Sequence, residues 1–308
     1  MNIVFMGTPD FAVPTLNSIY KNGYNVSLVV TQPDRKKGRG KKLTPTPVKQ
    51  KALDLGIEVF QPENINLKEN IERIKKYDPD VIVVVAYGQI LRKDILDIPK
   101  EGCINVHASL LPYYRGAAPI NWVVINGEDK TGVTTMYMEE GLDTGDMILK
   151  EEIAIKENDT AGVIHDKLMN LGANLLIKTL DIIDRGEVKR TPQDDENSSY
   201  APMMDKNLGK IDWNKSKRTI KNLVRGTNPW PCAYTHYKGK KMKIYKVDIG
   251  NEVKGTNGEI VKVDDEGIYV SVKDGSIIIK KIQFPGKRPM KVKDYLRGNE
   301  IETNIILG

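Results

Sequence analysis

Cysteine, histidine and long apolar runs are scarce in this sequence of 308 residues, and each scarcity excludes a class of protein. Cys103 and Cys232, the two cysteines, fit a reducing cytoplasm and argue against a disulfide framework. No apolar run reaches about 18 residues, so we expect no membrane span. Residues 1–7 lack a basic leader with a long apolar run, so we expect a first strand there and no signal peptide.

Two kinds of ligand-binding motif are also missing. The Gly-x-Gly-x-x-Gly fingerprint of dinucleotide-binding folds is absent, because the first turn reads Gly7-Thr-Pro-Asp-Phe-Ala12 and Pro9 has no N–H to offer a phosphate. His107, His165 and His236 are scattered, and Cys103 with His107 gives two ligands where zinc needs three or four. We therefore expect no metal, and we interpret Cys103 as a small buried hydrophobe.

In the first half of the chain, apolar runs typical of strands alternate with helical patterns. This alternation predicts an α/β domain with a Rossmann-like, mostly parallel sheet and helices on its faces. The strands expected there are Ile3–Met6, Val26–Thr31, Val81–Ala86, Cys103–Val106 and Val133–Met138. The helices expected there are Phe11–Asn22, Pro47–Leu55, Leu67–Tyr77, Ala118–Asn126 and Thr160–Arg185, the last capped by Asp159 or Thr160.

The C-terminal third has a different pattern, in which glycines punctuate five short strands after a helix at Ser216–Val224. This pattern predicts a small β-barrel of the oligonucleotide-binding type. The expected strands are Ala233–Tyr237, Lys241–Val247, Glu259–Val263, Ile268–Val272 and Ile277–Ile282. We therefore divide the chain into an α/β domain at residues 1–188, a polar linker at 189–206 and a barrel domain at 207–308.

The net charge of +6 is unevenly distributed. Residues 204–308 contain 22 Lys and Arg against 12 Asp and Glu, a surplus of +10, whereas residues 1–203 have a balance of −4. A basic end on a slightly acidic body is typical of a protein whose C-terminal region meets a polyanion. The alternative is a generally lysine-rich chain, and charge does not separate RNA from DNA or a membrane surface.

A second basic feature lies near the first strands. Six cations fall within eight residues, namely Arg35, Lys36, Lys37, Arg39, Lys41 and Lys42. The default interpretation of such a run is a solvated loop. The glycines at positions 38 and 40 confer mobility, however, and the loop lies near the carboxyl edge of the expected sheet. We therefore expect it to fold over an RNA backbone that enters the site.

Asn105, His107 and Asp143 are the residues on which the chemistry is expected to depend. Asn105 and His107 are one residue apart, so their side chains emerge on the same face of an extended segment. Asp143 offers a carboxylate that favours the protonated ring and is able to accept the proton of an attacking amine. The amide and the imidazolium are donors for the oxyanion that forms when an amine attacks a formyl or acyl carbon.

We therefore predict an acyl-transfer site at the carboxyl ends of parallel strands, where ligands bind in α/β sheets. The alternative is a buried His107 satisfied by a backbone carbonyl, with Asn105 merely closing a turn. In the following loop, Leu110 and Leu111 offer apolar surface for a flat ring system, and backbone groups there are candidates to read its polar edge. Arg115 either holds this loop or contacts an anionic substrate.

These motifs resemble those of the methionyl-tRNA formyltransferase family over essentially the whole chain. The resemblance rests on Gly7-Thr-Pro-Asp-Phe-Ala12, Thr31-Gln-Pro-Asp34, Gly38-Arg-Gly-Lys-Lys42, Val83-Val-Val-Ala-Tyr-Gly88, Ile104-Asn-Val-His107, Ser109-Leu-Leu-Pro112, Arg115-Gly-Ala-Ala-Pro-Ile120, Gly141-Leu-Asp-Thr-Gly-Asp146, Ile211-Asp-Trp213 and Asn228-Pro-Trp-Pro231. Cys232 stands where many members carry glycine, a departure that touches nothing catalytic.

The resemblance implies that 10-formyltetrahydrofolate donates a formyl group to the α-amino group of methionine on initiator tRNA. It implies catalysis by Asn105, His107 and Asp143, and folate binding by Ser109, Leu110, Leu111 and Pro112. It also implies contact of the acceptor stem with the basic loop of Arg35, Lys36, Lys37, Arg39, Lys41 and Lys42, with Arg39 prominent. We expect a cytoplasmic monomer that uses no metal and meets no membrane.

Two other functions remain open at this point. A folate-dependent formyltransferase acting on a small amino sugar or a purine precursor would share the Asn, His and Asp site. It would not explain the lysine-rich loop and the basic barrel together. A nucleic-acid-binding module with a catalytically idle first domain is the alternative from a different class.

Overall fold

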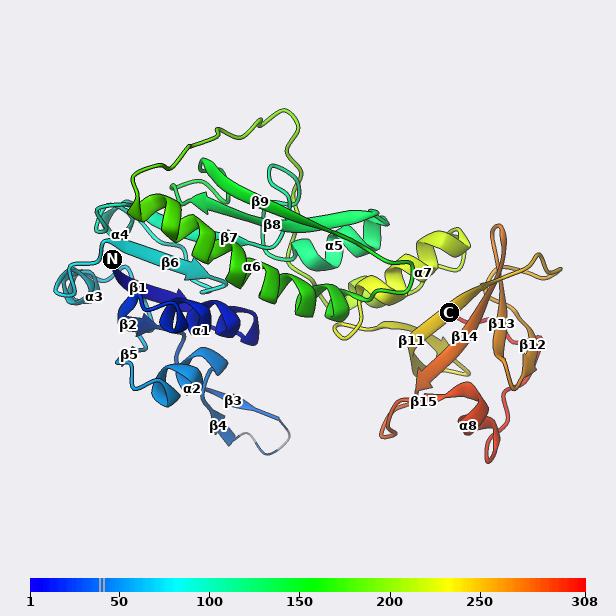
Figure 1. The fold of residues 1–308 in the computed structure, drawn as a ribbon. Coiled ribbons are helices and arrows are strands. Elements are labelled where there is room, and N and C mark those ends of the chain that lie inside the picture. Colours follow the sequence, from blue (N-terminus) through cyan, green and yellow to red (C-terminus); the bar gives the residue numbers. More distant parts are fainter. Residues whose placement is uncertain (39, 41) are drawn as a thin grey trace. The chain divides into compact units, whose positions relative to one another are not determined.

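The computed structural model describes residues 1–38, 40 and 42–308, and its contacts divide the chain into two compact units (Figure 1). The N-terminal unit comprises residues 1–116, 131–153 and 165–200. The C-terminal unit comprises residues 117–130, 154–164 and 201–308. Neither unit is one continuous stretch, because α5 (Pro119–Asn126) and the first residues of α6 (Ala161–Asp184) belong to the C-terminal unit.

A seven-stranded sheet forms the centre of the N-terminal unit, in the spatial order β5-β2-β1-β6-β7-β8-β9. Its strands are β1 (Asn2–Gly7), β2 (Asn25–Val30), β5 (Val59–Phe60), β6 (Val81–Val85), β7 (Cys103–His107), β8 (Lys130–Tyr137) and β9 (Met147–Ala154). The first five strands in this order are parallel. All residues of β6 are buried, as an uninterrupted apolar run requires at the centre of a covered sheet.

One part of the expected topology is wrong. β8 runs antiparallel to β7, with His107 opposite Thr134 and Ile104 opposite Tyr137. Asp143 therefore does not stand at the carboxyl end of a parallel strand, as the sequence suggested, but lies in the loop between β8 and β9. The loop returns along the sheet and brings Asp143 back to β7. The apolar pattern of β8 could not reveal its direction, because a strand covered on both faces has the same composition either way.

The helices that cover the sheet begin and end close to the expected residues. They are α1 (Val13–Lys21), α2 (Pro47–Asp54), α3 (Lys68–Lys75) and α6, whereas the short α4 (Lys93–Leu96) was not expected. The Thr160 hydroxyl accepts a hydrogen bond from the Val163 N–H, which confirms one of the two expected caps of α6. Within the described residues, none of the helices combines the length and hydropathy needed to span a bilayer.

The basic segment forms a two-stranded hairpin where the sequence indicated a mobile loop. β3 (Arg35–Lys37) pairs antiparallel with β4 (Lys42–Thr44). Gly38 follows β3 at φ +71°, a backbone conformation that glycine adopts without strain. Arg39 and Lys41 lie outside the described residues.

The C-terminal unit is built on an antiparallel sheet in the order β10-β11-β14-β13-β12, with β15 paired to β14. Its elements are α7 (Lys217–Gly226), β10 (Ala233–Tyr237), β11 (Lys240–Gly250), β12 (Ile260–Asp264), β13 (Gly267–Val272), β14 (Gly275–Gln283), β15 (Met290–Lys291) and α8 (Val292–Leu296). The expected five strands are confirmed; β15 and α8 were not expected.

The last residues of the chain connect the two edge strands of this sheet. The Ile260 N–H of β12 donates to the Ile305 carbonyl, and the Ile260 carbonyl accepts from the Asn304 N–H. The Leu307 N–H donates to the Gly258 carbonyl, and Gly308 exchanges two backbone hydrogen bonds with His236 of β10. Each edge strand therefore gains a partner for its free N–H and C=O groups. The sheet closes in this way toward the expected barrel.

Candidate active site

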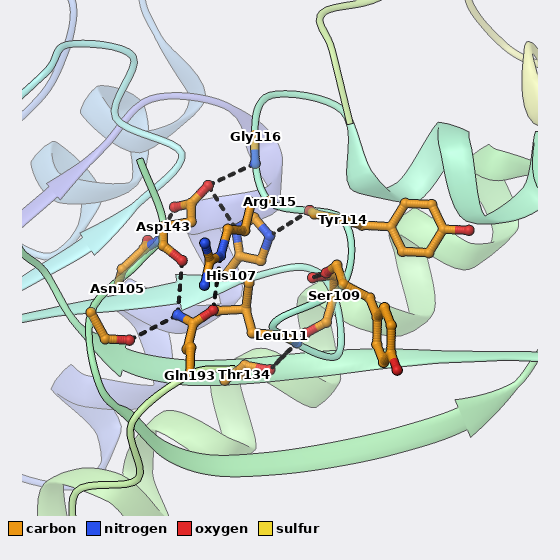
Figure 2. Close-up of polar contacts among 12 residues, drawn as sticks. Asn105, His107, Ser109, Leu111, Tyr114, Arg115, Gly116, Thr134, Asp143 and Gln193 are labelled. Carbon is orange, nitrogen blue, oxygen red and sulfur yellow. Dashed lines mark hydrogen bonds and ion pairs between the residues drawn. The ribbon is translucent and has the colours of Figure 1, made fainter. Parts of the chain in front are cut away.

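Asn105 and His107 of β7 both contact the carboxylate of Asp143 (Figure 2). Asn105 Nδ2 donates to Asp143 Oδ1 at 3.4 Å, and His107 Nδ1 lies 3.7 Å from Asp143 Oδ2. The side chains of His107 and Asp143 are 7% and 14% exposed. The strand period of two thus places amide and imidazole on one face, as expected, and tertiary structure adds the carboxylate.

The other ring nitrogen of His107 faces a backbone carbonyl. His107 Nε2 lies 3.0 Å from the backbone carbonyl oxygen of Tyr114. Because a carbonyl only accepts hydrogen bonds, Nε2 carries a proton in this arrangement. Nδ1 is the ring nitrogen that faces Asp143. The carbonyl contact expected for a merely structural histidine is present, but it coexists with the carboxylate contact.

Asp143 is held in an unusual backbone conformation. Its φ is +54°, in the left-handed region that residues with a Cβ rarely adopt. The Gly116 N–H donates to Asp143 Oδ2 at 2.8 Å. Both carboxylate oxygens consequently receive a hydrogen bond, one from Asn105 and one from Gly116, and Oδ2 also faces His107. Two hydrogen-bond donors and one imidazole nitrogen therefore converge on this carboxylate.

The loop after β7 is internally bonded. Ser109 Oγ donates to the Tyr113 carbonyl at 2.6 Å, and the Thr134 hydroxyl bridges the Ser109 carbonyl and the Leu111 N–H. The ammonium of Lys150 donates to the Leu111 carbonyl, and burial lowers the pKa of Lys150. The loop is therefore shaped by its own polar groups and by two neighbouring strands.

This bonding corrects one expectation about the loop. Leu111 is 1% exposed and packs with Met136 and Met147, so its side chain does not offer an apolar surface to a ring system. Its backbone N–H and C=O are also occupied. Leu110 and Pro112 are only half-buried. The sequence could not separate Leu110 from Leu111, because both are apolar neighbours and only packing decides which one turns inward.

Arg115 holds the loop, which resolves the two roles that the sequence left open. Arg115 Nε donates to Gln193 Oε1 at 3.0 Å, and Arg115 Nη2 donates to Asp195 Oδ1 at 2.7 Å. Its backbone N–H also donates to the Ser199 carbonyl at 2.8 Å. The guanidinium is thus bonded to two residues of the N-terminal unit.

Gln193 is a site-adjacent residue that sequence reasoning missed. Gln193 Nε2 donates to the backbone carbonyls of Asp143 and Gly145, each at 2.8 Å. It lies in the polar stretch expected to be a linker, where neither periodicity nor charge distinguishes it. The local sequence Thr191-Pro192-Gln193 signals nothing without the fold, so only the structure could identify Gln193.

Of the basic residues, Arg35, Lys36 and Lys37 lie on β3 and Lys42 lies on β4. Arg35, Lys36 and Lys42 are exposed. The hairpin is anchored at its base by Asp34, which accepts hydrogen bonds from Lys49 Nζ and Gln61 Nε2, each at 2.7 Å. The hydrogen bonds from Lys49 and then Gln61 hold the pKa of the Asp34 carboxyl below its ordinary value.

The remaining chemistry-bearing residues lie in other surroundings. Cys103 is buried, its thiol directed to the backbone carbonyls of Ile95 and Leu96, and burial raises its pKa, so the structural interpretation is confirmed. His165 of α6 lies beside Asp10 and Asp166, and His236 contacts the carbonyl of Gly308.

Comparison with known proteins identifies the family. The formyl transferase model matches residues 1–180, and the model of the formyl transferase C-terminal domain matches residues 203–300. The chain belongs to the formyltransferase family. A methionyl-tRNA formyltransferase of Clostridioides difficile is 58% identical over the full length of both chains, and one of Alkaliphilus metalliredigens is 56% identical over 100% of this chain and 98% of its own.

Solved structures show the same fold in more distant formyltransferases. WlaRD, a sugar 3N-formyl transferase, aligns with a TM-score of 0.68 at 24% identity, over 94% of this chain and 99% of its own. The N-formyltransferase of Helicobacter canadensis gives the same TM-score and identity, over 90% of this chain and 98% of its own. The resemblance inferred from the motifs is thereby confirmed for family and fold.

Proposed function

We propose that this chain is a methionyl-tRNA formyltransferase. It transfers the formyl group of 10-formyltetrahydrofolate to the α-amino group of methionine on initiator tRNA, and the N-formylmethionyl-tRNA serves translation initiation. The observation that carries the proposal is the convergence of the Asn105 amide, the His107 ring and the Gly116 N–H on the Asp143 carboxylate. The full-length identity to relatives of that name supports the choice of substrate.

The proposed chemistry begins when the neutral amine adds to the formyl carbon. A new C–N bond forms, and the carbonyl oxygen becomes an oxyanion. Asn105 Nδ2 has a second N–H besides the one given to Asp143, and His107 Nδ1 lies 3.7 Å from Asp143, beyond hydrogen-bond distance. The amide and a protonated His107 are therefore the proposed donors that stabilise this charge. The C–N bond to the folate nitrogen then breaks, which restores the carbonyl and expels tetrahydrofolate once that nitrogen is protonated.

Asp143 is the proposed acceptor of the proton that the attacking amine loses. The attacking amine loses one proton on the way to the amide product, and the Asp143 carboxylate is the nearby base able to accept it, directly or through water. A free α-amino group titrates near about 7.7–8.0, so a fraction of it is already neutral at cellular pH. The enzyme therefore depends on positioning and oxyanion stabilisation more than on a strong base.

For the folate, we keep Ser109, Leu110, Leu111 and Pro112 as the proposed contact segment. Its polar atoms are largely bonded within the protein, so the half-buried Leu110 and Pro112 are the positions left to touch a ring system. Ser109 and Leu111, both buried, support the shape of the segment from within.

Two basic surfaces support tRNA as the acceptor. The proposed contacts of the N-terminal unit are Arg35, Lys36, Lys37, Arg39, Lys41 and Lys42. In the C-terminal unit, Lys241 lies 3.3 Å from the ring centroid of Tyr234. Burial, followed by the neighbouring charges of Lys243 and Lys206, lowers the pKa of Lys241. Repulsion among these lysines indicates a cluster of positive charge, and the negative phosphates of an RNA would reduce that repulsion.

The division into residues 1–188, 189–206 and 207–308 remains part of the proposal, as do a cytoplasmic location and a monomeric state. In this scheme the first domain binds folate and carries out the reaction. The last domain binds tRNA. Formyl transfer to a small amino sugar is the alternative function, since distant relatives with this fold carry that name.

One assay tests the proposed function directly. Formyl-labelled tetrahydrofolate is mixed with the enzyme and charged initiator methionyl-tRNA, and formylmethionine is measured after deacylation. Free amino sugars and uncharged tRNA serve as competing acceptor and control. We expect rapid label transfer to charged tRNA that weakens steeply as salt is raised. Comparable kcat/KM on a free amino sugar would contradict the proposal.

A further inference from the structure

Gln193 joins two loops that meet at the proposed catalytic carboxylate. Its Nε2 donates to the carbonyls of Asp143 and Gly145 at 2.8 Å, and its Oε1 accepts from Arg115 Nε at 3.0 Å (Figure 2). One side chain thus uses two donors and one acceptor at once. Among uncharged side chains of this length, a primary amide is the group that offers both functions.

The loop that carries Asp143 needs such support. Residues 139–142 are exposed, and Asp143 adopts a positive φ that costs about 1 kcal/mol or more for a residue with a Cβ. The Gln193 hydrogen bonds reach the backbone on both sides of Thr144, so they restrain the peptide groups that fix the direction of the Asp143 side chain.

The second loop is restrained at the same point. Arg115, bonded to Gln193, directly precedes Gly116, and the Gly116 N–H donates to Asp143 Oδ2 at 2.8 Å. The contacts from Asp143 through Gly116 and Arg115 to Gln193, and back to the Asp143 carbonyl, form a closed ring. Asp195 adds an ion pair to Arg115 at 2.7 Å from the same segment.

We infer that Gln193 is a positioning residue for the formyl-transfer reaction, holding the Asp143 carboxylate against His107 and Asn105. This inference rests on the proposed function. The segment around Gln193, expected to be a linker, then contributes to catalysis without touching the reacting atoms. A displacement of about 1 Å at a catalytic group is enough to cost up to about 100-fold in rate.

The test uses two substitutions in the full-length protein. Gln193→Leu removes all three hydrogen bonds, whereas Gln193→Glu keeps the shape and the bond to Arg115 but sets an oxygen against two carbonyl oxygens. We expect kcat for methionyl-tRNA formylation to fall about 10-fold to 100-fold in both, with KM for the folate within about twofold of wild type. Asn197→Leu is the matched control, since Asn197 lies in the same segment and bonds to Asp194.

A positioning role is separated from a merely structural one by a double-mutant cycle. In an Asp143→Asn background, Gln193→Leu should lower the residual kcat by less than about threefold, because the group that it positions is already gone. An equal fold-loss in both backgrounds would overturn the inference. Full kcat in Gln193→Glu would also overturn it, since shape alone would then suffice.

Amide hydrogen exchange gives a readout that needs no substrate. Gln193→Leu should raise exchange at residues 139–146 at least about tenfold, while exchange in β6 stays as in wild type. Unchanged exchange at 139–146 would contradict the inference even if the enzyme used another acceptor. Inactivity of the wild-type protein on methionyl-tRNA would instead contradict the proposed function, so the two failures are distinct.

Discussion

The β3–β4 hairpin and residues 193–200 are both polar segments of the N-terminal unit, but their side chains are used differently. In the hairpin, Arg35, Lys36 and Lys42 are exposed. In residues 193–200, Gln193 and Asp195 bond to Arg115, and the Ser199 hydroxyl accepts a hydrogen bond from the Tyr114 N–H at 2.8 Å. The hairpin therefore presents its charge to solvent, whereas Gln193, Asp195 and Ser199 form hydrogen bonds that shape the loop after β7.

The contrast teaches that a polar segment can serve a reaction in two physical ways. Charge acts over distances of about 10 Å through solvent and needs little geometric precision. A hydrogen bond acts over about 3 Å and needs alignment. A contribution from charge can be recognised in the amino-acid composition, whereas a contribution from a hydrogen bond depends on where the partner lies. The predictions below test whether the two segments differ as this contrast requires.

The largest effect is expected at the site that both segments serve. His107→Ala should lower kcat for methionyl-tRNA formylation about 10²-fold to 10⁴-fold, because it removes an oxyanion donor and the partner of Asp143. The measurement is single-turnover transfer of labelled formyl groups, with Asn197→Leu as the folded control. Unchanged formylation by His107→Ala would contradict this mechanism.

A smaller effect is expected at the hairpin. Arg39→Ala should reduce kcat/KM for methionyl-tRNA about tenfold, through loss of a charge-assisted contact with the RNA, and should leave folate binding unchanged. Steady-state kinetics with each substrate varied in turn provide the measurement. Raising the salt concentration should shrink the difference between wild type and variant. If Arg39→Ala alters neither kinetic constant, the hairpin is only a solvated surface.

The smallest effect concerns the anchor of the hairpin. Asp34→Asn should lower the free energy of unfolding by about 1 kcal/mol at pH 7, since Asp34 pairs with Lys49 at 2.7 Å. Because folding lowers the pKa of Asp34, its stabilising contribution is full above about pH 4 and is lost as pH falls through the lowered value.

Urea unfolding of wild type and Asp34→Asn at several pH values checks this. The difference between the two proteins should stay constant from pH 7 to about pH 5 and narrow below about pH 4. If the difference in the free energy of unfolding widened as the pH fell, the direction assigned to the pKa shift of Asp34 would be wrong. A raised KM for tRNA in Asp34→Asn would weaken the contrast, because the hairpin would then depend on tertiary hydrogen bonds as well.

Much of the fold was predictable because it depends on local patterns. The runs that became β1, β2, β6 and β7 were recognisable, and so were the helices between them and the strands of the C-terminal unit. The missed elements include short ones such as β5, α4 and α8, where a few residues do not establish a period, and also the eight-residue β9. The direction of β8 and the closure by the final residues also escaped prediction, since both depend on distant partners.

The candidate site could likewise be predicted only in part from the sequence. Asn105 and His107 could be paired from the sequence because a strand alternates its side chains. The Gly-Leu-Asp-Thr-Gly turn marked Asp143 as a candidate carboxylate, and family resemblance supported it. The roles of Arg115 and Gln193 were out of reach, because the two residues are 78 positions apart and their bond depends on the path of two loops.

Local chemistry along the chain was enough to specify most strands and helices, the basic character of residues 35–42 and the pair on β7, because these follow from backbone periodicity and from which side chains are polar. Folding alone decided that the Asp143 carboxylate reaches that pair, that Leu111 turns inward, and that Gln193 supports the loop. Those outcomes require groups 23 or more residues apart in the sequence to come into contact. Such long-range contacts depend on the packing of the whole unit, which a short stretch of sequence does not determine.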